Sequence, residues 1–142
     1  MNAKGIIWGF VSGAESASAK YVLEKRLKLK FPPLIAMGDA PDKPNPEGFI
    51  DLAKKLSKDK LGCSNLPIAY IGDTIADVQT VLNARKKIPN QKFISIGIAP
   101  PHLHLEDRKK ERNLYESKLK EVGADLIVNS VNDLINVNLE LL

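Results

Sequence analysis

Two aspartates, Asp73 and Asp77, lie four residues apart directly after the short apolar run at residues 68–71. Apolar residues at helical spacing follow them: Ile75, Val78, Val81 and Leu82. The pattern predicts a strand, a tight turn and a helix, with Asp73 at the carboxyl end of the strand. Open α/β sheets bind their ligands at that end. A carboxylate pair there suits Mg²⁺, which takes one or two carboxylates, several waters and phosphate oxygens.

Two further polar residues follow other predicted strands. Ser12 ends an apolar run, and Lys43 lies in a proline-rich segment after the predicted strand at residues 34–37. Because parallel strands present their carboxyl ends on one edge, we expect both residues on the same rim as the two aspartates. A hydroxyl, an ammonium group and carboxylates near helix N-termini suit a phosphate beside a divalent cation.

Each of these residues also has a structural interpretation. Ser12 with Gly13 fits a strand-to-helix turn. Thr74 with Asp77 fits a capping box, in which Thr74 caps the helix and Asp77 accepts from a free backbone N–H. Asp39 fits either a turn or the acidic rim. Both interpretations stay open for each residue, because a helix cap can support a metal site.

His102 and His104 would share one face of an extended segment, which makes a metal pair conceivable. Two ligands are too few for a metal site, so a loop leading into the next helix is the simpler interpretation. The single cysteine, Cys63, has no neighbouring histidine in the sequence to activate it as a nucleophile. Trp8 lies among apolar residues and is expected in the core.

The rest of the chain alternates strand and helix patterns. Strands are predicted at residues 6–12, 34–37, 68–71, 93–97 and 125–128. Helices are predicted at about residues 15–29, 46–57, from 75 onward, at 105–122, and after a capping Ser130. The first helix is expected to bury one stripe: Ala19, Val22, Leu23 and Leu27. This alternation predicts an α/β fold with a parallel sheet covered on both faces, in one domain over residues 1–142.

The composition of the chain indicates which classes of binding partner are not expected. The chain has 142 residues, of which 44% are hydrophobic, with one cysteine, no long apolar run and no secretory signal, so we expect a cytoplasmic protein without a membrane partner. The net charge is +4, but basic residues are mixed with acidic ones and only 6% of residues are aromatic. Nucleic acid is therefore not expected as a partner.

Three motifs occur in order along the chain: VSG at residues 11–13, KPNP at 43–46 and GDTIAD at 72–77. They resemble the second, third and fourth signature motifs of the haloacid dehalogenase superfamily, which consists mostly of phosphatases. The stretches MGDAPDKPNPEGF, GDTIADVQTVLNAR and GIAPPHL are similar to uncharacterised hydrolase-like proteins of cyanobacteria and algae, which leaves a plastid location open. The resemblance extends from about residue 6 onward and implies a three-layer Rossmann-like fold.

The resemblance also implies a role for each candidate. Ser12 would hydrogen-bond the transferring phosphoryl group, Lys43 would balance its charge, and Asp73 would bind Mg²⁺. Asp77 would assist at the metal by orienting water or Lys43. The implied activity is Mg²⁺-dependent hydrolysis of a small phosphorylated metabolite, which depends mainly on positioning and charge neutralisation.

The family's nucleophile belongs to an Asp-x-Asp motif that this sequence does not contain. In the resembled fold that motif ends the first strand, so we expect this strand and the mobile cap to precede Met1. Without the attacking carboxylate we expect the chain alone to be inactive. The alternative is a non-catalytic domain that binds a phosphate compound or a protein.

Overall fold

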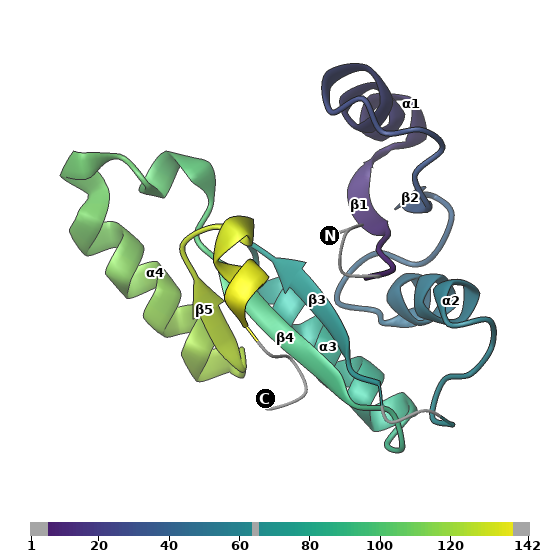
Figure 1. Ribbon diagram of the computed structural model, residues 1–142. Coiled ribbons are helices and arrows are strands. Elements are labelled where there is room, and N and C mark those ends of the chain that lie inside the picture. Colours follow the sequence, from purple (N-terminus) through teal and green to yellow (C-terminus); the bar gives the residue numbers. More distant parts are fainter. Residues whose placement is uncertain (1–5, 64–65, 138–142) are drawn as a thin grey trace. The chain divides into compact units, whose positions relative to one another are not determined.

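Parallel strand pairing organises both halves of the chain in the computed structural model, which describes residues 6–63 and 66–137 (Figure 1). The chain divides into two compact units, Met1–Leu61 and Gly62–Leu142, and each is described by itself. The α/β class and the parallel pairing are confirmed. The strands form two parallel sheets, one of two strands and one of three. The single three-layer sheet and the single domain over residues 1–142 stay predictions.

The first unit is built on the parallel pair β1 (Phe10–Glu15) and β2 (Leu34–Met37). Between these strands, α1 (Ser16–Lys20) continues into the π-helical segment η2 (Tyr21–Arg26). Helix α2 (Glu47–Leu56) follows β2. Both α1 and α2 contact both strands, so the apolar faces of the helices and the sheet bury one another.

Strand β1 begins later than predicted. The apolar residues Ile6 and Ile7 are 45% and 67% exposed, and the ladder begins where Phe10 pairs with Leu34. Trp8 is half-buried just before the strand, with its ring edge-on to Phe10 and the ring centroids 5.6 Å apart. The prediction of a strand at residues 6–12 was wrong at both ends, because the partner strand and not the apolar run decides where pairing starts.

The predicted buried stripe of the first helix is only half right. Ala19 and Leu23 are buried, whereas Val22 and Leu27 are 44% and 57% exposed. The predicted α-helix gives way to η2 at Tyr21. A π-helical turn takes more residues than an α-helical turn, so side chains spaced for an α-helix no longer share one face.

Helix α2 follows its prediction closely. Asn45 Oδ1 accepts a hydrogen bond from Glu47 N at 3.0 Å, Pro46 directly precedes the helix, and Ser57 directly follows it. Three apolar residues at helical spacing are buried: Phe49, Leu52 and Ala53. A polar acceptor at the start and an apolar stripe along one side were enough to place this helix.

The second unit has a three-stranded parallel sheet in the order β3-β4-β5. Its strands are β3 (Ile68–Gly72), β4 (Phe93–Ile98) and β5 (Leu126–Val128). Helix α3 (Ile75–Lys87) connects β3 to β4, and α4 (Lys109–Val122) lies between β4 and β5. The strands and helices predicted for this half are confirmed, with shifts of a few residues at their ends.

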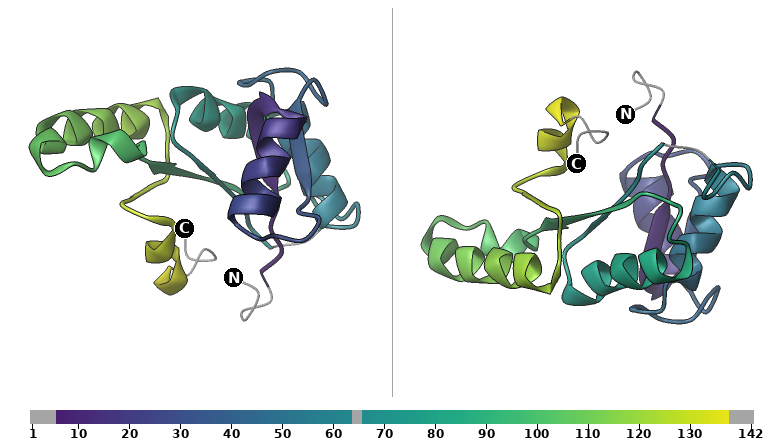
Figure 2. Two further views of the ribbon diagram at one scale, coloured as in Figure 1. Left: turned by 90° about the horizontal axis from the view of Figure 1, so that it is seen from above. Right: turned by 90° about the horizontal axis from the view of Figure 1, so that it is seen from below.

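Helical segments cover both faces of this sheet (Figure 2). Helices α3 and α4 lie on one face, over a cluster of buried residues: Val78, Leu119 and Ala124. The opposite face carries a second cluster, Ile94, Ile96 and Val128, against which Leu134 of the 3-10 helix η5 (Val131–Asn136) packs. The alternating sides of β4 thus serve two apolar layers, as expected for a parallel strand between helices.

Short 3-10 helices complete the second unit. The segments η3 (Pro101–Leu103) and η4 (Glu106–Arg108) precede α4, which ends at Gly123 with a φ of 123°. Ser130 caps η5 through a capping box with Asp133, so the predicted cap is confirmed on a 3-10 helix. Over the described ranges, no helix has the length and apolar character needed to cross a membrane.

Candidate functional site

A cavity of about 490 Å³ lies at the carboxyl ends of β3, β4 and β5. Asp73 follows β3, Ala99 follows β4 and Asn129 follows β5, and all three residues line the cavity. Ile98 and Val131 contribute apolar wall. This edge of a parallel α/β sheet is where such folds bind ligands, so the cavity is the candidate functional site.

The capping box predicted for Thr74 and Asp77 forms next to this cavity. Asp77 Oδ2 accepts hydrogen bonds from Thr74 N at 3.0 Å and from Thr74 Oγ1 at 2.7 Å. In return, Asp77 N donates to Thr74 Oγ1 at 3.1 Å. Asp77 is only 3% exposed, so these bonds compensate a buried carboxylate and hold the start of α3 beside the end of β3.

Gly72 is needed for this arrangement. A Cβ atom at position 72 would lie 2.2 Å from Asp77 Cβ and 2.5 Å from Asp77 Cγ. Any larger residue would therefore collide with the buried aspartate. The glycine lets the first turn of α3 approach the strand end, which brings Asp73 to the edge of the cavity.

Tyr70 holds the second oxygen of the buried aspartate. Its hydroxyl donates to Asp77 Oδ1 at 3.1 Å. Burial, first of all, and then the negative charge of Asp77 raise the pKa of Tyr70 far above its ordinary value of 10.0. The charge of Asp73 acts in the same direction, so both carboxylates influence this one hydroxyl. Tyr70 thus remains a neutral donor throughout the physiological pH range.

Asp73 differs from Asp77 in that its carboxylate has no hydrogen-bond donor among the residues that the structure describes. Its backbone carbonyl accepts from Tyr115 Oη of α4 at 2.7 Å, which ties the strand end to that helix. Burial, followed by the charges of Asp73 and Asp77, raises the pKa of Tyr115. The backbone of Asp73 is held while its carboxylate keeps its acceptor capacity.

The electrostatic character of the cavity follows from these groups. No lysine or arginine occurs among the described residues that line it, and Asp73 is an acid on its wall. The buried Asp77 adds a second negative charge near the same strand end, as its effect on Tyr70 shows. Such a site favours a cation or a neutral hydrogen-bond donor over a free anion.

Three polar residues of the lining were not predicted as ligand-binding residues: His104, Asn129 and Ser130. Ser130 Oγ is used locally, since it donates to Asp133 Oδ1 at 3.2 Å. His104 was considered only as half of a metal pair with His102, which is exposed and does not line the cavity. For Asn129 and Ser130 the available signal was their position directly after the strand predicted at residues 125–128, where parallel sheets gather loop residues.

The other candidates lie in the first unit. Ser12 Oγ accepts from Ala14 N at 3.1 Å, in keeping with the turn interpretation. Asp39 Oδ2 accepts from Ala36 N at 2.9 Å and closes the turn after β2, which is the first of its two interpretations. Lys43 is half-buried in the segment before α2. The structure brings Asp73 and Asp77 together, and the meeting of Ser12 and Lys43 with them stays a prediction.

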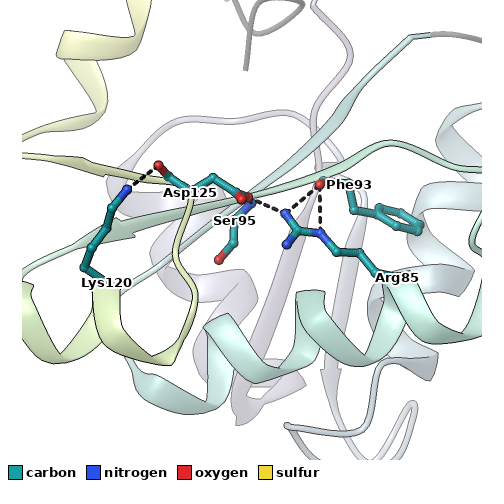
Figure 3. Close-up of polar contacts among 5 residues, drawn as sticks. All are labelled: Arg85, Phe93, Ser95, Lys120 and Asp125. Atoms are coloured by element: carbon teal, nitrogen blue, oxygen red, sulfur yellow. Dashed lines mark hydrogen bonds and ion pairs between the residues drawn. The ribbon is translucent and has the colours of Figure 1, made fainter.

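A polar network that sequence reasoning missed lies at the opposite edge of the second sheet (Figure 3). Arg85 of α3 donates to the Phe93 carbonyl oxygen from Nε at 3.1 Å and from Nη2 at 2.8 Å, and also forms an ion pair with Asp125. Asp125 Oδ2 accepts from Ser95 N at 2.7 Å, and Lys120 Nζ donates to the Asp125 carbonyl oxygen at 2.6 Å. Because Phe93 begins β4 and Asp125 precedes β5, this network anchors the amino ends of the strands.

Within residues 6–63 and 66–137, no group of three histidine, cysteine, aspartate or glutamate side chains gathers to hold an ion. Cys63 is exposed and unpaired by any disulfide. Comparison with models of known protein families finds no match for this chain, and comparisons with curated proteins and with solved structures find none either.

Proposed function

We propose that the chain is part of a magnesium-dependent phosphomonoesterase of the haloacid dehalogenase type that acts on a small phosphorylated metabolite. The observation that supports this best is Asp73. Its carboxylate lies at the carboxyl edge of a parallel sheet, lines a cavity that has no lysine or arginine among its described lining residues, and accepts no hydrogen bond from the described residues. A carboxylate in this state is suited to a cation.

The donor set agrees with Mg²⁺ more than with a softer metal. Mg²⁺ keeps several waters and is bound by one or two carboxylates together with phosphate oxygens, so Asp73 and a substrate phosphate would be enough. When bound, the ion would supply charge neutralisation at the phosphoryl oxygens. Asp77, whose oxygens serve the capping box, would support this strand end and the waters around the ion.

Ser12 and Lys43 complete the proposal. A serine hydroxyl would hold a phosphoryl oxygen, and an ammonium group would offset the charge of the phosphate and the acids. The proposal therefore requires these residues to meet Asp73. Cross-linking tests this requirement: in a Cys63→Ser background, a thiol-specific cross-linker with a span of about 10 Å should join cysteines at positions 12 and 73, because the phosphate and the ion would lie between them. Cysteines at positions 18 and 73 are the matched control, because Ser18 is an exposed helix residue.

The missing nucleophile limits what the chain can do alone. Since the sequence has no Asp-x-Asp, we expect no turnover of p-nitrophenyl phosphate with Mg²⁺. Turnover that survives Asp73→Asn would contradict both the expectation and the site. In a longer form with an Asp-x-Asp before Met1, Mg²⁺-dependent activity should appear and fall steeply on Lys43→Ala. The missing motif also favours the second candidate, a domain that binds a phosphate compound or a protein without turnover.

Mg²⁺ binding is the direct test of the proposal. Titration of the full chain, followed by NMR shifts of backbone amides, should give changes centred on Gly72 and Asp73 with an affinity of roughly millimolar order, because few charged ligands replace the waters of the ion. Asp73→Asn should abolish these shifts. Asp107→Asn, at an exposed position away from the cavity, should leave them unchanged. Equal binding by the Asp73 variant and the parent chain would overturn the proposal.

A further inference from the structure

The cavity at the carboxyl ends of β3, β4 and β5 is lined by more polar side chains than a metal ion alone would use. One polar side chain comes from the segment after each strand: Asp73, His104 and Asn129. The carboxylate of Asp73 and the side-chain amide of Asn129 have no hydrogen-bond partner among the residues the structure describes. The remaining lining is largely apolar and includes Ile98, Pro101 and Val131. A few convergent polar groups in an apolar cavity of this size are typical of sites for small organic molecules.

The ring of His104 is held in place by the backbone. Its Nε2 lies 2.9 Å from the carbonyl oxygen of Ala99, and because a carbonyl can only accept, Nε2 must carry the hydrogen. Ala99 is 2% exposed, so the anchor lies in the protein interior. In the neutral ring, Nδ1 is then an acceptor, and no described residue donates to it.

The chemistry of these three groups defines the ligand. Asp73 and His104 Nδ1 both accept hydrogen bonds, and the amide of Asn129 can donate as well as accept. His104 Nδ1, an acceptor beside apolar walls that the metal position at Asp73 does not use, suits a molecule that brings a hydroxyl donor on an apolar body. A free anion would meet the negative charge of Asp73 without a lysine or arginine among the described lining residues to balance it.

We propose that this cavity binds the alcohol half of the substrate, an apolar organic group that carries, besides the esterified oxygen, a free hydroxyl that donates to His104 Nδ1. One part of this inference, that the alcohol belongs to a phosphate ester, rests on the proposed phosphomonoesterase function. The binding itself depends only on the cavity. His104 is thereby a ligand-binding residue that selects among alcohols, separate from the metal position at Asp73.

Benzyl alcohol and toluene are the probes. In metal-free buffer, the full chain is titrated with each and amide shifts are followed by NMR. We expect benzyl alcohol to shift residues next to the cavity, such as Gly72, Ile98 and Asn129, and toluene to bind at least about threefold more weakly, since it lacks the hydrogen bond. Shifts spread over the whole chain, or equal binding of the two probes, would overturn the inference.

His104→Gln and His102→Gln form a matched pair of variants. The amide nitrogen of glutamine can still donate to the Ala99 carbonyl oxygen, so the loop anchor is kept, while the amide oxygen accepts from a different position than Nδ1. We expect about three- to tenfold weaker binding of benzyl alcohol for His104→Gln and no change for His102→Gln, whose side chain is exposed. Unchanged binding in the His104 variant, or equal losses in both, would refute the role of His104.

A third variant covers the case in which His104→Gln does not fold. Asn129 is exposed and its side chain has no hydrogen-bond partner among the described residues, so Asn129→Ala should keep the fold and weaken benzyl alcohol binding about threefold. Unchanged binding in that variant would count against the site. Benzyl alcohol binding without any Mg²⁺ binding at Asp73 would support the cavity and contradict the phosphomonoesterase. The opposite result would contradict only the inference about alcohols.

Discussion

Replacement of Gly72 by alanine should destabilise the second unit strongly, and the reason is purely steric. The new Cβ would lie 2.2 Å from Asp77 Cβ, and the contact would have to widen to the 3.4 Å at which ordinary van der Waals contact begins. The atom in the way belongs to the first turn of α3 and not to the end of a flexible side chain. The helix start must move, or Asp77 must leave its buried position.

The cost follows from what Asp77 holds. Moving it weakens the capping box, worth about 1 kcal/mol. It also weakens the bond from Tyr70 Oη at 3.1 Å, and hydrogen bonds to a charged group contribute about 1.5–3 kcal/mol. We therefore expect Gly72→Ala to lower the free energy of unfolding by about 2–4 kcal/mol. The general cost of inserting an extra methyl group into a well-packed site, about 1–3 kcal/mol, overlaps this range. Urea denaturation followed by circular dichroism at 222 nm measures it.

Gly13→Ala is the matched control. A Cβ at position 13 meets no heavy atom within 4 Å, so its stability should stay the same or rise by less than about 1 kcal/mol. The steric cause is isolated by repeating Gly72→Ala in an Asp77→Gly background, which removes the opposing Cβ and should shrink the loss to below about 1 kcal/mol. The reasoning is refuted if Gly72→Ala costs no more than Gly13→Ala, or if it costs the same with and without the Asp77 side chain.

Two other predictions concern the same unit. Because the pKa of Tyr70 is raised in the folded protein, the contribution of Tyr70 to stability is complete below the unfolded pKa of about 10 and is lost as pH rises above it. The urea midpoint should therefore fall above pH 10, and Tyr70→Phe should make this fall less steep. An equally steep fall in the variant would contradict the role of the buried hydroxyl. Asp125→Ala should lower the free energy of unfolding by about 1–3 kcal/mol, because it leaves the N–H of the buried Ser95 without its acceptor. Thermal denaturation measures the loss, with Asp107→Ala at an exposed position as the control variant. Equal melting temperatures for the two variants would contradict a stabilising role of the Asp125 network.

Local sequence signals placed most of the secondary structure. The capping box at Thr74 and Asp77 was predicted from residue types three positions apart, because the hydrogen bonds that make it span one helical turn. The alternation of apolar runs also predicted the parallel strands of the second unit, and the serine before the last predicted helix predicted the cap at Ser130. Where the interaction is local, the residue pattern contains nearly all of the physics.

The first unit shows where local signals fail. The apolar run at residues 6–12 predicted a strand, but pairing with Leu34 begins only at Phe10. The helical stripe placed Val22 and Leu27 in the core, and both are exposed where η2 departs from α-helical winding. A strand's extent depends on its partner, and a helix face depends on its winding, so neither is decided by the segment itself.

The sequence by itself determined the α/β class, the order of strands and helices, and the position of Asp73 at a strand end. Only the tertiary structure decided which side chains share the cavity and which are used up by the fold. Asp77 is committed to the start of α3, while His104 and Asn129, far apart in the chain, reach the same cavity as Asp73. The physical reason is that parallel pairing brings distant strand ends together, and burial and hydrogen bonding at those ends depend on all three strands at once.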